Sequence, residues 1–192
     1  MKRIGITAAI VAAAAAAPAL AQNCELHFEP VSPLAPFDFG VEALRVIDVG
    51  GGGQLYIGGH FVNIGASEFN KAARFDGTNF MPMGLGLHPY VENFIGCCSK
   101  AYTFSAFDDG SGPAVFVGGD FVTSWDNFPN ALLLSISRWR PSTGAWESLG
   151  GLINNDNCVF DCPPRVHDTQ VIQTSTGPAL VIGGTFSVLG FF

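Results

Sequence analysis

Histidine and acidic side chains are the residues of this 192-residue chain that could bind a metal ion. His60, His88 and His167 do not have the spacing of a zinc site, even with Asp168 next to the last of them. The stretch DDGSG (residues 108–112) offers oxygen ligands for Ca²⁺, but it lacks the alternating acids and the distal glutamate of an EF-hand loop. We therefore interpret it as a β-turn and expect neither a metal nor another cofactor.

Nucleophilic catalysis has equally little support in the sequence. No serine stands in a G-x-S-x-G elbow, and the four histidines have no obvious acidic partner. The sequence therefore favours a non-catalytic protein over an enzyme.

The N-terminal segment predicts export. Residues 1–21, MKRIGITAAIVAAAAAAPALA, begin with Lys2 and Arg3, continue as an alanine-rich apolar stretch and end in a small-x-small pattern. These are the parts of a signal peptide. We expect a secreted or periplasmic protein that begins near Gln22 and has no membrane span after cleavage.

Export also changes the interpretation of the five cysteines, because disulfides are the default in an oxidising compartment. Cys158 can pair with Cys162 within one loop, or Cys97 or Cys98 can bridge to that loop. Cys24 can then tie the N-terminal segment to the remaining vicinal cysteine. The odd number leaves one thiol free or paired outside the chain.

Composition limits the class of protein and of partner. Hydrophobic residues make up 48% of the chain and charged residues 13%, which predicts a packed fold rather than disorder. The net charge of −7 argues against a nucleic-acid partner, because phosphate binding needs clustered Lys and Arg.

A repeated motif organises the chain. The stretches IGGHF, VGGDF and IGGTF recur at spacings of 60 and 65 residues, and each holds a glycine pair behind a run of strand formers. Glycine inside a strand marks a bulge or a close backbone approach, and no helix or lysine follows to form a phosphate site. We interpret the pairs as structural markers: Gly58, Gly59, Gly118, Gly119, Gly183 and Gly184.

Each repeat reads as four short strands. In the second repeat we expect strands over residues 101–107, 114–117, 133–139 and 146–149, joined by turns such as RPSTGA. Trp139 and Trp146 are further markers, at the positions that Phe75 and Phe80 occupy in the first repeat. The expected fold class is all-β, with four-stranded antiparallel units.

The stretch VGGDF…SRWRPSTGAWESLG resembles a kelch-type blade, with Arg140 where that family usually has Asp. The amino-acid sequence of this repeat also resembles repeat arrays of secreted bacterial proteins of unassigned function. The resemblance covers about residues 41–192 and implies a β-propeller with blades at about 41–98, 99–162 and, in part, 163–192, after an extended lead-in over residues 22–40. Galactose-oxidase-type enzymes share the blade pattern, but their copper site has no counterpart here.

The number of repeats is too small to close a propeller ring, because propellers have four to eight blades and this chain offers two and a partial third. Three alternatives follow: a fragment of a longer product, a ring completed by other chains, or a compact open β-sheet protein. The incomplete ring is our expectation.

The expected function is that of a binding or structural module. Propellers bind ligands through loops at one end of the blades, here around residues 60–70 and 120–130. Trp125 and Phe128 in the second loop can contact a carbohydrate or protein ligand, or else cover the blade core. The alternative is a truncated piece of a larger exported propeller enzyme whose catalytic residues lie outside this chain.

Overall fold

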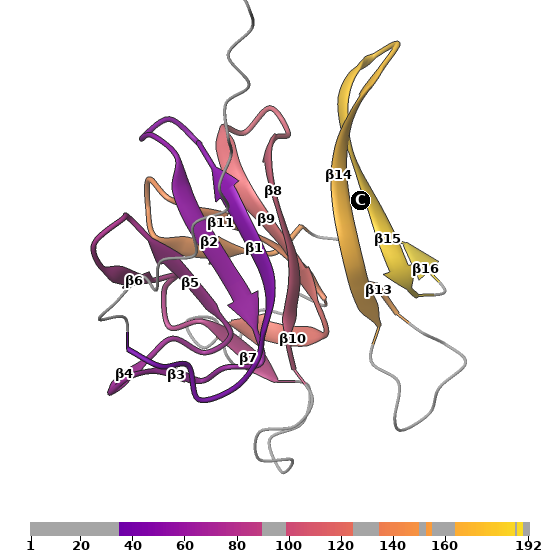
Figure 1. Cartoon of the computed structure of the whole chain (residues 1–192). Coiled ribbons are helices and arrows are strands. Elements are labelled where there is room, and N and C mark those ends of the chain that lie inside the picture. The colour runs from indigo at the N-terminus through magenta and orange to yellow at the C-terminus, as the bar shows by residue number, and fades with distance from the viewer. Residues whose placement is uncertain are drawn as a thin grey trace, which may run out of the picture. The chain divides into compact units, whose positions relative to one another are not determined.

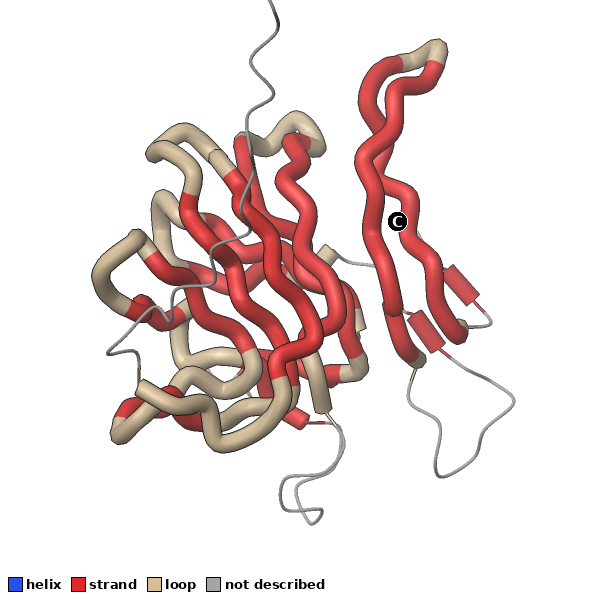
Figure 2. Tube along the Cα trace, in the orientation of Figure 1, coloured by secondary structure: helices blue, strands red, loops and turns tan. Residues whose placement is uncertain are grey.

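The computed structural model describes residues 35–89, 99–124, 135–149, 153–154, 164–186 and 188–189. Contacts divide the chain into two units, Met1–Leu34 and Ala35–Phe192, and all the described residues belong to the second. Every regular element in them is a strand, and every pairing is antiparallel (Figure 2). The expectation of an all-β fold of antiparallel strands is therefore confirmed.

The first sheet has the order β1-β2-β5-β6. Its strands are β1 (Val41–Ile47), β2 (Gln54–Gly59), β5 (Ala72–Phe75) and β6 (Phe80–Pro82). The tight reversal between β1 and β2 forms because Gly50 and Gly52 adopt positive φ and the Asp48 carboxylate accepts their backbone N–H groups. This turn fixes the register of the hairpin.

The second sheet repeats this arrangement with the order β8-β9-β11-β12. Its strands are β8 (Ala101–Asp108), β9 (Pro113–Gly119), β11 (Ile136–Arg140) and β12 (Ala145–Glu147). The third strand begins at Ile136, later than residue 133, because Ser135 adopts a φ of 67° and cannot continue a strand. The fourth strand is shorter than expected and ends at Glu147.

A long hairpin of β14 (Arg165–Thr174) and β15 (Gly177–Thr185) begins the third repeat. Strand β14 contacts β8 and β9 of the second sheet, just as β8 contacts β1 and β2 of the first. The strands β1, β8 and β14 therefore lie side by side, as Figure 1 shows. Two four-stranded sheets and one hairpin are thus stacked in sequence order.

Short ribbons recur where one repeat follows another. Strand β7 (Leu87–Pro89) pairs with β10 (Phe121–Ser124), and β13 (Ile153–Asn154) pairs with β16 (Val188–Leu189). An isolated bridge between Phe37 and Ile64 is the counterpart at the first sheet, beside the small β3 (Asn63–Ile64) and β4 (Ser67–Glu68) hairpin. In each case the segment before a repeat pairs with the segment after its second strand.

The main core fills the space between the first and second sheets. Large side chains from both sheets meet there, with the Tyr56 ring 6.0 Å from Phe104 and 6.3 Å from Trp139. Burial of one such side chain stabilises the fold by about 1.5–3 kcal/mol. A second cluster covers the other side of the first sheet, where Phe37 packs edge-on against Phe61 and Phe80.

Candidate functional site

Several residues singled out in the sequence lie outside the described residues. These are Trp125 and Phe128 of the expected ligand loop and all five cysteines: Cys24, Cys97, Cys98, Cys158 and Cys162. The disulfide and ligand-loop interpretations therefore stay predictions.

The second glycine of each pair lies against the first strand of its own sheet. A Cβ added at Gly59 would stand 2.2 Å from the Gly40 carbonyl oxygen, and one at Gly119 would stand 2.0 Å from that of Lys100. A β-bulge lies opposite in β1, β8 and β14 alike, and it pushes the carbonyl toward the glycine. No side chain fits at these positions.

The first glycine of each pair faces the next repeat instead. A Cβ at Gly58 would stand 2.6 Å from Phe104, and a Cβ at Gly118 would stand 2.5 Å from Val166. These two glycines therefore allow adjacent repeats to pack closely. Gly183 occupies the same position in β15, but a Cβ added there would meet no atom within 4 Å.

The two marker tryptophans belong to the core between the sheets rather than to an open site. Both side chains are buried. The Trp146 indole donates a hydrogen bond of 2.7 Å to the Met83 carbonyl of the first sheet, and the Arg74 guanidinium lies 4.8 Å from the centre of the Trp139 ring. Both residues thus join the two sheets.

The most developed polar cluster surrounds Asp120, the residue after the second glycine pair. Its carboxylate is buried and accepts hydrogen bonds from the Lys100 backbone N–H and from the Tyr102 hydroxyl, the latter at 3.0 Å. Arg165 of β14 approaches the same carboxylate at 3.7 Å. In the same way, the Lys100 ammonium reaches back to Glu42 of the preceding repeat at 2.7 Å.

Burial dominates the titration of this cluster. It raises the pKa of Asp120, and the opposing hydrogen bonds from Lys100 and Tyr102 and the charge of Arg165 do not cancel the effect. Burial and the Asp120 charge raise the pKa of Tyr102 to about 12. The Asp120 carboxylate thus has two hydrogen-bond donors in its own repeat and a guanidinium of the next repeat beside it, which makes the cluster a contact between these two repeats.

The sequence did not single out this cluster, although the repeat alignment held a signal for it. Lys100 and Arg165 occupy equivalent positions before each bulge, and Tyr102 and His167 occupy equivalent positions within it. The Tyr102 and His167 rings lie 5.5 Å apart. A row of polar residues at matching repeat positions predicts contacts between neighbouring repeats.

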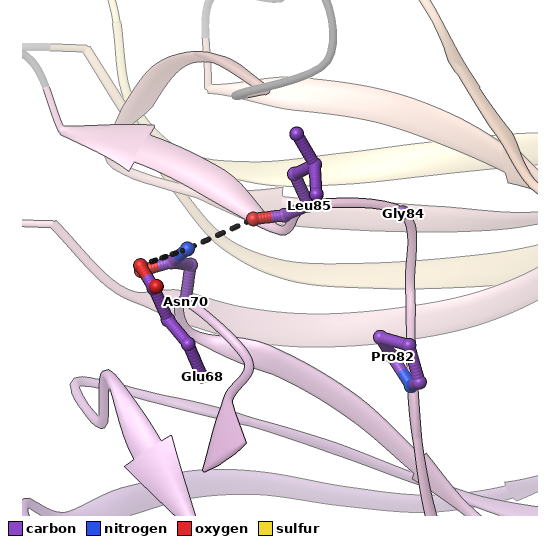
Figure 3. Close-up of a pocket in the computed structure, with 5 residues that line it drawn as sticks. All are labelled: Glu68, Asn70, Pro82, Gly84 and Leu85. Atoms are coloured by element: carbon purple, nitrogen blue, oxygen red, sulfur yellow. Dashed lines mark hydrogen bonds between the residues drawn. The ribbon is translucent and has the colours of Figure 1, made fainter.

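A separate, accessible cavity lies beside the first sheet (Figure 3). It has a volume of about 400 Å³ and is lined by Glu68, Asn70, Pro82, Gly84 and Leu85. Glu68 and Asn70 come from the loop around residues 60–70 that we expected to carry a ligand. The lining therefore combines a carboxylate, an amide and aliphatic surface.

The Asn70 side chain links two of the residues that line this cavity. The amide nitrogen of Asn70 donates to the Glu68 carboxylate and to the Leu85 carbonyl, both at 2.9 Å. Asn70 and its neighbour Lys71 both adopt positive φ, and both are buried. Burial lowers the pKa of Lys71 against the opposing charges of nearby carboxylates, Glu68 among them.

Metal-binding and membrane-spanning features are not found in the described ranges. No group of three His, Cys, Asp or Glu side chains there is placed to hold a metal ion. The described part of the chain also has no helix long and apolar enough to cross a membrane.

The DDGSG stretch forms the turn between β8 and β9. There the Asp108 carboxylate accepts hydrogen bonds from the backbone N–H groups of Gly110 and Gly112.

Comparison with known proteins found no relative of this chain. No protein-family model, no curated protein and no solved structure matches this chain, so its resemblance to kelch-type blades rests on the sequence motifs alone.

Proposed function

We propose that this chain is an exported, non-catalytic binding module built from β-propeller-type repeats, and that it binds a neutral carbohydrate at the cavity of Figure 3. One observation carries the proposal. The buried carboxylate of Asp120 is occupied by Lys100 and Tyr102 of its own repeat and by Arg165 of the next, whereas the Glu68 carboxylate, which accepts one hydrogen bond from Asn70, lies in an open cavity with aliphatic walls.

The chemistry of the lining favours a polyhydroxylated ligand. A carboxylate accepts hydrogen bonds from sugar hydroxyls, and the aliphatic surfaces of Leu85 and Pro82 suit the apolar face of a sugar ring. The negative charge of Glu68 and the net charge of −7 disfavour anionic ligands. Leu85 is exposed, so a ligand can reach it.

The test is a binding screen on immobilised neutral glucans, galactans and mannans, followed by calorimetry with the best oligosaccharide. Glu68→Ala removes a charged acceptor, so it should weaken binding by about ten- to a hundredfold, since hydrogen bonds to charged groups contribute about 1.5–3 kcal/mol. Leu85→Asp should weaken it as well by removing the apolar contact.

A matched control is Gln170→Ala, which changes an exposed side chain of β14, away from the cavity lining. It should bind as the wild type does. The proposal fails if no neutral glycan binds, or if Glu68→Ala binds with unchanged affinity while circular dichroism shows an intact fold.

A further inference from the structure

Residues at the two ends of the stack are more exposed than several of their counterparts inside it. Gly58 packs on Ala101 and Phe104 of the second sheet, and Gly118 packs on Val166 of the β14–β15 hairpin. A Cβ added at Gly183 would meet nothing within 4 Å. The third repeat thus has the glycine of a repeat-to-repeat contact, but the surface that contacts it is absent among the described residues.

Residues around Gly183 show the same contrast. Tyr56 and Phe116 occupy equivalent positions of the first and second repeats, and their exposed fractions are 1% and 3%. The third equivalent, Val181, is 46% exposed. Ile172, the counterpart of the buried Ile47, is 43% exposed. We name Ile172, Val181 and Gly183 the tail face.

The opposite end shows the complementary contrast. Leu44 of β1 is the counterpart of Phe104, which contacts a preceding glycine and is 2% exposed, whereas Leu44 is 53% exposed. Val41 is the counterpart of the fully buried Ala101 and is likewise exposed. We name Val41, Leu44 and the exposed Val46 the head face.

The outer strands of the first sheet are covered on this side. Ala35 and Phe37 pack against the cluster around Ile57 and Phe61. The head face on β1 lies outside that cover. Among the described residues, seven large hydrophobic side chains are exposed, and five of them belong to the head and tail faces. Apolar exposure concentrated in this way indicates an interaction surface.

We propose that the tail face of one copy docks on the head face of a second copy of this chain. The two contacts inside the chain already join a tail-type surface to a head-type surface, so the contact between copies continues them. Gly183 would face Val41 and Leu44 as Gly58 faces Ala101 and Phe104. The interface is heterologous, because two different faces meet, and it can therefore extend into rings or longer assemblies.

The experiment is sedimentation velocity of the full chain over a range of concentrations. The wild type should associate in a concentration-dependent manner. Val181→Asp and Leu44→Asp each place a charge in the contact and should weaken association on the order of tenfold or more. Gly183→Val should do the same while leaving the monomer folded, because a Cβ at this position meets no atom within 4 Å.

A mixture of two variants tests the head-to-tail geometry itself. Val181→Asp retains a native head face, and Leu44→Asp retains a native tail face. At concentrations where each variant alone is monomeric, an equimolar mixture should form a dimer and nothing larger. An interface between two identical faces would not give this result.

Leu85→Asp is the control, because it removes an exposed leucine from the carbohydrate cavity rather than from an end face. It should associate like the wild type, so the two proposals can fail separately. The inference is overturned if the wild type is monomeric up to about millimolar concentration, where a contact would be worth less than about 4 kcal/mol. It is also overturned if the end-face variants associate as well as Leu85→Asp does.

Discussion

Gly118 and Gly119 stand next to each other in β9, and each is required for a different reason. Gly119 makes room for the Lys100 carbonyl of its own sheet, and Gly118 makes room for Val166 of the next repeat. Successive residues of a strand point to opposite faces, so a pair serves both contacts at once. The motif therefore encodes a bulge within a sheet and a contact between repeats.

Asp120 follows this pair and carries a pH-dependent prediction. In the folded protein, burial raises its pKa above the ordinary value of 3.8. The contribution of this group to the free energy of unfolding is therefore fully present below about pH 3.8 and is lost as pH rises through the raised pKa. Asp120→Asn keeps a neutral side chain and should remove this decline, measured as the urea midpoint of unfolding against pH.

Glu147 provides a control of opposite sign. Burial alone would raise its pKa, but hydrogen bonds from Arg140 and Arg138 hold the pKa below the ordinary value of 4.5. Its contribution to stability is present above about pH 4.5 and is lost as pH falls through the lowered value. Glu147→Gln should therefore flatten the acid side of the profile. An Asp120→Asn profile parallel to that of the wild type would contradict the first prediction.

At the level of elements, the two repeat-to-repeat contacts differ in chemistry. The first is aromatic and centred on Phe104, whereas Thr169 stands at the equivalent position of the second. The buried Thr169 hydroxyl lies 3.0 Å from that of Thr103 and 2.7 Å from that of Ser105. A hydroxyl network thus joins β14 to β8.

This network predicts a local loss of stability. Thr169→Val keeps the shape of the side chain and removes its hydroxyl contacts, while Thr103 and Ser105 can still donate to the Asp168 carboxylate and the Thr169 carbonyl, so the cost should be about 0.5–1.5 kcal/mol. Hydrogen exchange in β14 and β15 should accelerate, while exchange in β2 and β5 stays unchanged. Adding Ser105→Ala should cost less than the sum of the two single changes. Equal acceleration in all sheets would contradict the idea of a separate contact.

Sequence patterns predicted the strands because their causes are local. Alternating apolar residues, glycine turns and the repeat spacing depend on near neighbours, and the first two strands of the second repeat lie within a residue or two of the expected bounds. Ser135 shows the limit: its positive φ depends on a backbone hydrogen bond to Phe121, a residue distant in sequence. Propensity alone would have continued the strand through it.

The candidate site was less predictable for a similar reason. Glu68 and Asn70 were expected only as part of a loop, because the Leu85 carbonyl that orients Asn70 comes from another turn. The pairing of Asp120 with Arg165 joins two repeats and needs the stacked arrangement to be known first. Side-chain partners of this kind depend on tertiary contacts, and a residue's type indicates them only in part.

For the whole molecule, the arrangement of charges predicts how association responds to salt. Lys100 and Arg165 reach back to acids of the preceding repeat, at Glu42 and Asp120. Gly40 stands at the equivalent position before the bulge of β1 and has no side chain to offer. The proposed contact between copies therefore has no counterpart of these ion pairs and depends on apolar surface.

Each copy also carries a net charge of −7, so two copies repel each other at low ionic strength. Raising NaCl from about 0.05 to about 0.5 M screens this repulsion and leaves the apolar contact intact. The dissociation constant from sedimentation should therefore fall, or stay within about twofold, across this range. The Leu85→Asp variant, with one more negative charge away from the faces, should show a slightly steeper response. Association that weakens about tenfold with salt would instead indicate an interface held by ion pairs and would contradict docking through the head and tail faces.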